Sequence, residues 1–162
     1  MSTALRAALR GNGDDLLAYF ERRVEPRDDA ADLLAETMLQ AWRRHESAPA
    51  EATEIRMWLF GIARNVLANH QRGRRRRVNL ANKLRSHLQQ PVTPSSEEAV
   101  AVRDAVERLR PEQRELITLV HWEGFTVAEA AAVLELNPST ARGWYAAAKQ
   151  ELRASLSPAL LP

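Results

Sequence analysis

The chain has 162 residues, 45% of them hydrophobic and 6% aromatic, so it is long enough for one domain or two small ones and too apolar to be disordered throughout. It contains no cysteine, which excludes a disulfide framework and a thiolate zinc site. The N-terminus lacks the apolar core of a signal peptide, and no apolar run approaches the roughly 18 residues that a membrane span needs. We therefore expect a cytoplasmic protein without membrane insertion.

The formal net charge of +2 conceals a separation of charge along the chain. Residues 1–77 carry 14 arginines and 11 acids, net +3, whereas residues 99–162 carry 7 basic residues and 8 acids, net −1. Residues 28–36 hold four acids and no base, while residues 55–77 hold seven arginines and no acid. The N-terminal half is therefore expected to present one acidic and one basic surface.

Helical spacing of apolar residues dominates the chain and strand-like alternation is nearly absent, which predicts an all-α fold. The first helix is expected to begin near Asp14, where the preceding asparagine and glycine supply turn chemistry, and to stop near Pro26. A second helix begins near Asp28, with acids in its first turn that suit the helix dipole. Its predicted apolar face comprises Leu33 or Leu34, Met38, Ala41 and Trp42.

A third helix is predicted from about Glu54, after a segment broken by a proline and small residues. The arginine run continues from its far end, and Gly73 leaves open whether the last arginines stay helical. The apolar pattern weakens from Val78, and the next residues have the Pro, Ser and Gln content of a linker. We therefore expect two small helical domains, residues 1–77 and 99–162, joined by a flexible linker over residues 78–98.

The C-terminal domain carries the pattern of a helix-turn-helix. Gly124 is expected to end one helix, Thr126 caps the next, and Pro138 opens the last. Two helices joined by a turn of three or four residues form this unit, and its second helix can enter a DNA major groove. Short helix pairs of this kind also occur in plain helical bundles. DNA binding is favoured by polar residues in its first turns and opposed by the domain's net charge of −1. These first-turn residues are Ser139, Thr140 and Arg142.

Five arginines occupy six consecutive positions at 72–77. Such a run occurs in solvated tails, in targeting signals and in nucleic-acid-binding surfaces. Here it extends a helix that also bears hydrogen-bonding side chains, which is how a DNA-facing helix is composed. The neighbouring polar residues are Arg56, Arg64, Asn65, Asn69 and His70.

Three acids of the second helix, Asp29, Asp32 and Glu36, recur at intervals of three and four and so share one side. They either satisfy the dipole of their own helix or form a protein-docking face. The four histidines are scattered, no glycine-rich phosphate loop is present, and no nucleophile has a base near it in sequence. We expect no catalytic residue, no metal and no cofactor, so an enzyme is the least supported class.

Taken together, these residues resemble the bacterial RNA polymerase sigma factors, specifically the small two-domain extracytoplasmic-function (ECF) group. The stretch "DDAADLLAETMLQAW" looks like the region 2 helix that docks on core polymerase. The stretch "IRMWLFGIARNVLANHQRGRRRR" looks like the following helix, which meets the promoter's minus-ten element. Residues 109–152 resemble region 4, which reads the minus-thirty-five element.

The resemblance implies a mechanism without catalysis by the chain itself. The factor binds core RNA polymerase, places its domains on promoter DNA and helps strand separation by capturing an unstacked base. A separate anti-sigma protein is expected to control it. The implied polymerase-binding residues are Asp29, Asp32 and Glu36. The implied DNA-binding residues are Arg64, Asn65, Asn69, Arg72, Arg74, Arg75, Arg76, Arg77, Ser139, Thr140 and Arg142.

The chain departs from the family pattern at several positions. Ala35 stands where glutamine is frequent, Glu135 replaces the usual turn glycine, and Trp144 and Ala147 occupy positions that are commonly basic. We therefore expect promoter affinity to rest mainly on the N-terminal domain. Two other hypotheses remain open from sequence alone: a stand-alone helix-turn-helix transcriptional regulator, and a helical module that binds only proteins.

Overall fold

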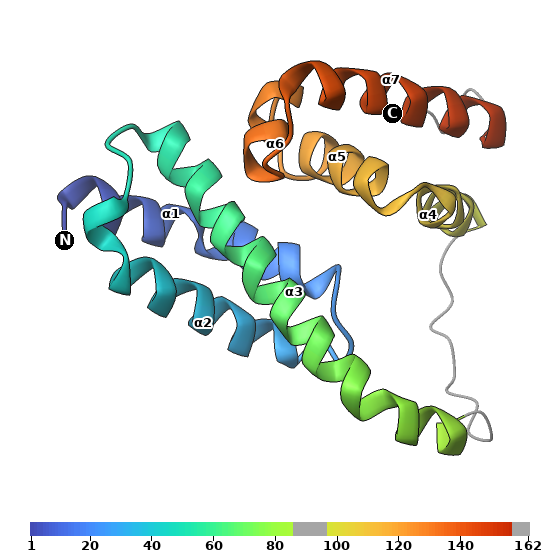
Figure 1. Ribbon diagram of the computed structural model, residues 1–162, viewed down its shortest axis with the longest axis horizontal. Coiled ribbons are helices and arrows are strands. Elements are labelled where there is room, and N and C mark those ends of the chain that lie inside the picture. The colour runs from blue at the N-terminus through green and yellow to red at the C-terminus, as the bar shows by residue number, and fades with distance from the viewer. Residues whose placement is uncertain (86–96, 157–162) are drawn as a thin grey trace. The chain divides into compact units, whose positions relative to one another are not determined.

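The computed structural model describes residues 1–85 and 97–156, with the backbone alone for residues 75–85. Every regular element within these ranges is a helix, which confirms the predicted all-α class (Figure 1). The chain separates into two compact units, residues 1–90 and 91–162, which are described in turn. None of the helices in the described ranges has an apolar stretch of the length that a bilayer requires.

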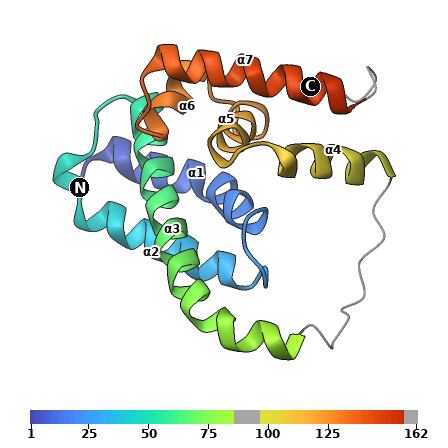
Figure 2. The ribbon, with the colours of Figure 1, turned by 45° about the vertical axis from the view of Figure 1, so that its right-hand side comes forward.

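The first unit contains three long helices and a short 3-10 turn. They are α1 (Thr3–Glu21), α2 (Asp29–Arg43), η1 (His45–Ser47) and α3 (Ala52–Arg85). Each long helix packs against the other two, as both ribbon views show (Figures 1 and 2). The interior is apolar, because each helix turns its hydrophobic side chains toward the others. Its largest fully buried side chains are Leu5, Leu16, Tyr19, Phe20, Ile55, Leu59 and Phe60.

Helix α1 begins at Thr3, eleven residues earlier than the predicted start near Asp14, so that prediction was wrong. Ser2 caps the helix, because its side-chain oxygen accepts a hydrogen bond from the backbone N–H of Leu5 at 3.1 Å. Asn12, which looked like a turn residue, instead donates its side-chain amide to the carbonyl of Ala8 at 2.8 Å within the helix. Burial of Leu5 in the core outweighs the low helix propensity of the glycines that follow it.

Helix α3 runs without a break through Gly73 to Arg85, so its backbone stays helical through the whole arginine run. The first part of the expected linker, residues 78–85, therefore belongs to this helix, and residues 86–96 lie outside the described residues. Both ribbon views show the C-terminal end of α3 reaching past α1 and α2 (Figures 1 and 2). The helix thus carries residues of the run away from the core of the first unit.

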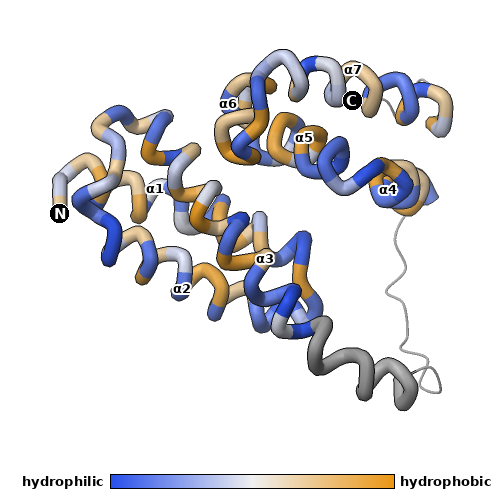
Figure 3. The backbone as a smooth tube through the Cα atoms, in the orientation of Figure 1, coloured by the Kyte–Doolittle hydropathy of each residue, from blue (hydrophilic) through white to orange (hydrophobic). Residues whose placement is uncertain are grey.

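The second unit contains α4 (Glu97–Arg108), α5 (Pro111–His121), α6 (Val127–Val133) and α7 (Pro138–Ser155). Helix α7 packs against each of the other three, and α5 also contacts α6. Apolar and polar residues interleave along every helix, as the orange and blue segments of Figure 3 show, so each helix has one face for the core and one for solvent. The buried residues that join α4, α5 and α7 are Ala105, Val106, Leu109, Ile117, Ala148, Leu152 and Leu156.

Candidate functional site

The acidic residues of α2 lie at its N-terminal half and differ in exposure. Asp32 and Glu36 are exposed to solvent, whereas Asp29 is half-buried. The side-chain amide of Gln40 donates a hydrogen bond to Glu36 at 2.9 Å, which fixes that carboxylate along the helix surface. Asp32 and Glu36 are four residues apart and so lie one turn from each other on the same side. They form a negative surface that solvent and a partner can reach.

Two large apolar side chains continue this surface toward the end of α2. Leu39 is 39% exposed and Trp42 is 56% exposed. The prediction that Trp42 lies on the buried face was wrong, because Ala41 occupies the core position there and the next residue points about 100° further around the helix. Helical periodicity alone did not separate these neighbours, although the spacing of three between Leu39 and Trp42 indicated a shared side. We call Asp32, Glu36, Leu39 and Trp42 the α2 face.

The polar residues of α3 also share one side. Asn65, Asn69 and Arg72 are all exposed and are spaced by four and three residues, so they form a stripe along the helix. The guanidinium of Arg72 donates a hydrogen bond to the side-chain oxygen of Asn69. Arg64 and Arg74 are half-buried. The side chains of Arg75, Arg76 and Arg77 lie outside the described residues, and only their helical backbone is placed.

Two residues grouped with this stripe from sequence are instead half-buried and contact neighbouring helices. Arg56 donates hydrogen bonds to Asp15 at 2.9 Å and to Asn12 at 2.5 Å, and its guanidinium lies 4.8 Å from the centre of the Phe60 ring. His70 lies toward α2, with Nε2 at 3.5 Å from a carboxylate oxygen of Asp29. These two residues contact the neighbouring helices, whereas Asn65, Asn69 and Arg72 face solvent.

The helix-turn-helix of the second unit forms as predicted. Thr126 and Glu129 make a reciprocal capping box at the start of α6: the Thr126 hydroxyl accepts from the backbone of Glu129 at 3.1 Å, and the Glu129 carboxylate accepts from the backbone of Thr126 at 2.9 Å. Pro138 occupies the first turn of α7, and Asn137 caps that helix by accepting from the backbone N–H of Ser139 at 2.9 Å. The start of α7 is therefore held by side-chain chemistry as well as by packing.

The outer surface of the first two turns of α7 is polar. Ser139, Thr140 and Arg142 are all exposed, and Arg142 donates a hydrogen bond to the Ser139 hydroxyl at 3.3 Å. Ala130, Ala131 and Ala141 are fully buried, which permits α6 and α7 to cross closely. Trp144 is half-buried, and the Arg110 guanidinium lies 5.9 Å from the centre of its ring. Three polar side chains are thus exposed near the N-terminal end of α7.

Glu135 closes the turn between α6 and α7 with a φ of 56°, a left-handed conformation that is unfavourable for a residue with a side chain. We predict that Glu135→Gly raises the free energy of unfolding of the second unit by about 0.5–1 kcal/mol, because glycine adopts this conformation without strain. Urea unfolding followed by circular dichroism measures the change. Gly124→Ala is the matched control, since Gly124 has a φ of 75° and should lose stability. A loss of stability in both variants contradicts the prediction.

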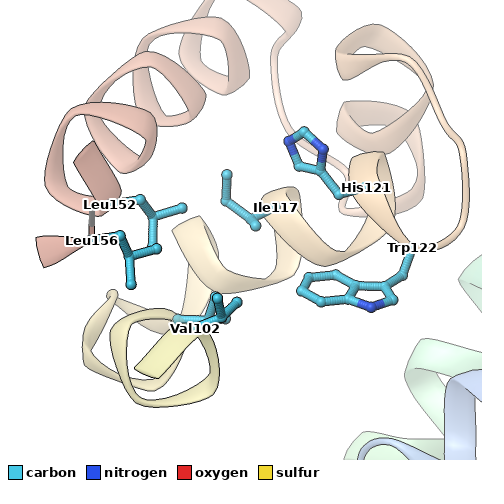
Figure 4. A pocket seen from close by; sticks show the side chains of 7 residues that line it. Val102, Ile117, His121, Trp122, Leu152 and Leu156 are labelled. Atoms are coloured by element: carbon cyan, nitrogen blue, oxygen red, sulfur yellow. The ribbon is translucent and has the colours of Figure 1, made fainter. Parts of the chain in front are cut away.

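An open apolar cavity of about 310 Å³ lies among α4, α5 and α7 of the second unit. Figure 4 shows Val102, Ile117, Leu152 and Leu156 gathered on one side, with the Trp122 ring on the other. Trp122 is 48% exposed. At the edge of the cavity, Nε2 of His121 lies 2.9 Å from the Tyr145 hydroxyl, and the two rings are stacked. The sequence pattern does not indicate this cavity, because its lining comes from three separate helices.

Burial at this edge lowers the pKa of His121 below its ordinary value of 6.5, and the positive charge of nearby Lys149 lowers it further. Since the unfolded chain then takes up the proton more readily, this group's contribution to stability is present above pH 6.5 and is lost as the pH falls below that value. We predict that the unfolding midpoint in urea drops between pH 7.5 and 5.5, and that His121→Gln makes this drop smaller. An equal drop in both proteins contradicts the prediction.

No metal centre forms within residues 1–85 and 97–156, because no three His, Asp or Glu side chains gather closely enough there to hold an ion. The polar residues described above are instead spread over exposed helix surfaces. Such surfaces are suited to binding macromolecules rather than to enclosing a small substrate.

Comparison with known proteins identifies both units. Residues 9–77 match Sigma-70 region 2, and residues 99–152 match Sigma-70, region 4. The ECF RNA polymerase sigma factor EcfG of Rhodopseudomonas palustris is 33% identical over 134 residues, covering 80% of this chain and 72% of EcfG. The ECF RNA polymerase sigma factor BldN of Streptomyces coelicolor is 35% identical over 131 residues, covering 76% of this chain. This match spans 49% of BldN, so the chain accounts for about half of that relative's length.

A solved structure has the same architecture. It is the sigma factor RpoE from Bartonella quintana in complex with the anti-sigma factor NepR, and the match has a TM-score of 0.68 at 25% sequence identity. The match covers 92% of this chain and 94% of the other. The two helical units and their order along the chain are therefore shared with a protein of known fold.

Proposed function

Because the chain belongs to the ECF RNA polymerase sigma factors, which direct promoter-specific transcription initiation, we propose that it binds core polymerase through α2 and promoter DNA through α3 and α7. One observation carries this proposal: the region 2 and region 4 matches fall in the family's order and within separate compact units. A binding surface on each unit lets one chain engage two promoter elements at once. We propose residues 1–77 and 99–162 as the limits of the two functional domains, in line with the matched regions, while the backbone of α3 continues to Arg85 and α4 begins at Glu97.

The α2 face is proposed as the polymerase-docking surface. Asp32 and Glu36 supply charge that steers a basic partner, while Leu39 and Trp42 supply apolar area that gains free energy when it leaves water. Tryptophan is one of the residue types enriched in binding hot spots. Asp29, the third acid of the docking prediction, lies at the border of this face. Docking through α2 leaves the exposed stripe of α3 available for DNA.

The proposed DNA contacts fall on two helices. Asn65, Asn69 and Arg72 face solvent on α3. We include the half-buried Arg64 and Arg74 with them, because the same helix continues through the arginines at positions 72–77. Arg75, Arg76 and Arg77 are proposed as phosphate contacts on charge alone. Ser139, Thr140 and Arg142 at the start of α7 are proposed to reach base edges and phosphates of the upstream element. The chain itself is proposed to act without catalysis, in the cytoplasm where the polymerase is found.

A separate anti-sigma protein is the proposed regulator. The related RpoE of Bartonella quintana has been solved in complex with the anti-sigma factor NepR. This chain exposes apolar side chains on both units, including Trp42 and Trp122, which a partner can cover. We propose that such a partner competes with core polymerase for these surfaces.

A mobility-shift experiment separates the sigma factor from a stand-alone regulator. Labelled genomic fragments are incubated with the full chain, with core polymerase, or with both. We expect a specific shift only with both proteins, because the weakly charged second unit gains its DNA affinity through tethering to polymerase. A specific shift by the full chain alone favours the stand-alone regulator, and no complex with core polymerase contradicts the proposed function.

A further inference from the structure

Asp29 and His70 meet between α2 and α3 of the first unit. His70 comes three residues after Leu67 and four after Val66, both buried, so it continues the core-facing side of α3 rather than the polar stripe. Asp29 is the first residue of α2. Its carboxylate oxygen lies 3.5 Å from Nε2 of His70, and the two residues are 41 positions apart in the chain. The contact therefore joins the start of one helix to the middle of the other.

The His70 nitrogen is in a position that needs a partner. Nε2 has no exposure to solvent and makes no hydrogen bond of good geometry with any group in the described residues. Burial of a polar atom without a partner is unfavourable, and the Asp29 carboxylate oxygen at 3.5 Å is a polar group close to this nitrogen. The His70 side chain is 25% exposed and that of Asp29 is 35% exposed, so water screens this contact only in part. Moving the Asp29 carboxylate outward would remove the polar group that lies 3.5 Å from Nε2.

The other two acids of α2 are in a different situation. Asp32 and Glu36 are exposed, and Glu36 is oriented along its own helix by Gln40. A partner can meet either carboxylate without disturbing a contact between helices. The three acids, which are equivalent in the sequence pattern, are therefore separated by the fold into one that faces α3 and two that face outward.

We infer that Asp29 and His70 form an interhelical clasp that takes Asp29 out of the docking face, so that Asp32 and Glu36 are the carboxylates that meet the polymerase. This inference rests on the proposed function and assigns different roles to residues of the same helix. His70 acts as a positioning residue, because it holds the first turn of the docking helix against the DNA-facing helix. It does not itself contact DNA.

The test compares three single substitutions in the full chain: Asp29→Asn, Asp32→Asn and Asp28→Asn. Asp28 is the matched control, because it lies one residue before Asp29 at the helix start and makes no capping hydrogen bond through its side chain. Thermal unfolding is measured for each, and affinity for core polymerase is measured by competition against labelled wild-type chain. All three changes remove one negative charge near the same helix end.

We expect Asp29→Asn to lower the melting temperature of the first unit by about 4 °C and to leave polymerase affinity within about twofold of wild type. Asp32→Asn should do the opposite, with affinity falling about tenfold and the melting temperature unchanged. Asp28→Asn should lower the melting temperature by less than Asp29→Asn does and polymerase affinity by less than Asp32→Asn does. A double variant that exchanges the two residues, Asp29→His with His70→Asp, should lose less melting temperature than the sum of the losses of Asp29→His alone and His70→Asp alone. A direct contact requires this non-additivity.

Two outcomes overturn the clasp. One is an Asp29→Asn variant that loses as much polymerase affinity as Asp32→Asn, and the other is an exchange variant whose losses simply add. The melting temperatures test the Asp29–His70 contact even if the chain binds no polymerase. If the wild-type chain binds no polymerase, the proposed function fails, whereas the Asp29–His70 contact stands or falls on the unfolding data alone.

Discussion

Replacing Arg74, Arg75, Arg76 and Arg77 with glutamine is expected to weaken promoter binding by the polymerase complex roughly tenfold to hundredfold at 0.15 M salt. These four residues are four of the seven arginines between residues 55 and 77. Residues 99–162 carry a net charge of −1 and so do not replace the lost positive charge. The plot of log affinity against log salt concentration should also become less steep by about 2 to 4, because each lost phosphate contact removes a released counterion.

The control for this experiment removes the same charge elsewhere on the first unit. Arg6, Arg10, Arg27 and Arg44 are exposed and lie off the α3 stripe, so their replacement by glutamine should change the slope by less than one. Fluorescence anisotropy over a series of salt concentrations measures both slopes. Equal changes in the two variants would show that only overall charge matters, which contradicts a DNA-facing role for the end of α3.

Trp42→Ala is expected to lower affinity for core polymerase about thirtyfold without lowering the melting temperature. The side chain is 56% exposed, so its removal leaves no cavity in the core. In the complex, the ring would be buried beside Leu39, and truncation of an interface tryptophan is often among the most costly changes. Competition binding against labelled wild-type chain measures the affinity, and circular dichroism measures the melting temperature.

Arg44→Ala is the control for Trp42→Ala. Arg44 follows directly after α2 and is exposed, but it lies outside the α2 face. Its substitution should leave polymerase affinity within about twofold. A Trp42→Ala variant that binds polymerase as tightly as wild type shows that α2 docks through its acids alone or does not dock at all.

Local sequence chemistry was enough to predict several elements of the fold. Thr126 and Pro138 specify helix starts through a capping oxygen and a fixed φ, and these effects act within four residues. Asn12 shows the limit of this approach. Its side chain suits a turn, yet the burial of Leu5 in a three-helix core extends α1 through it.

The candidate site was predictable as a set of residue types but not as a set of roles. Asp29, Asp32 and Glu36 follow one helical pattern, and only the position of His70 on α3 distinguishes the first from the other two. Trp42 was assigned to the core because it follows Met38 by four residues, but Ala41 occupies the core position and Trp42 is exposed. Which acids and aromatics stay exposed depends on packing between helices that are distant in sequence, and helical periodicity does not encode that packing.

A run-off transcription assay tests the central claim most directly. Core RNA polymerase is mixed with the purified full chain and with genomic DNA fragments, and transcripts are mapped by length. We predict discrete transcripts from a small number of fragments that appear only when both proteins are present, and that Trp42→Ala and the four-arginine variant each produce less of them. Transcripts that do not depend on the chain, or a complete absence of transcripts despite a stable complex with core polymerase, would contradict its role as a promoter-specificity subunit.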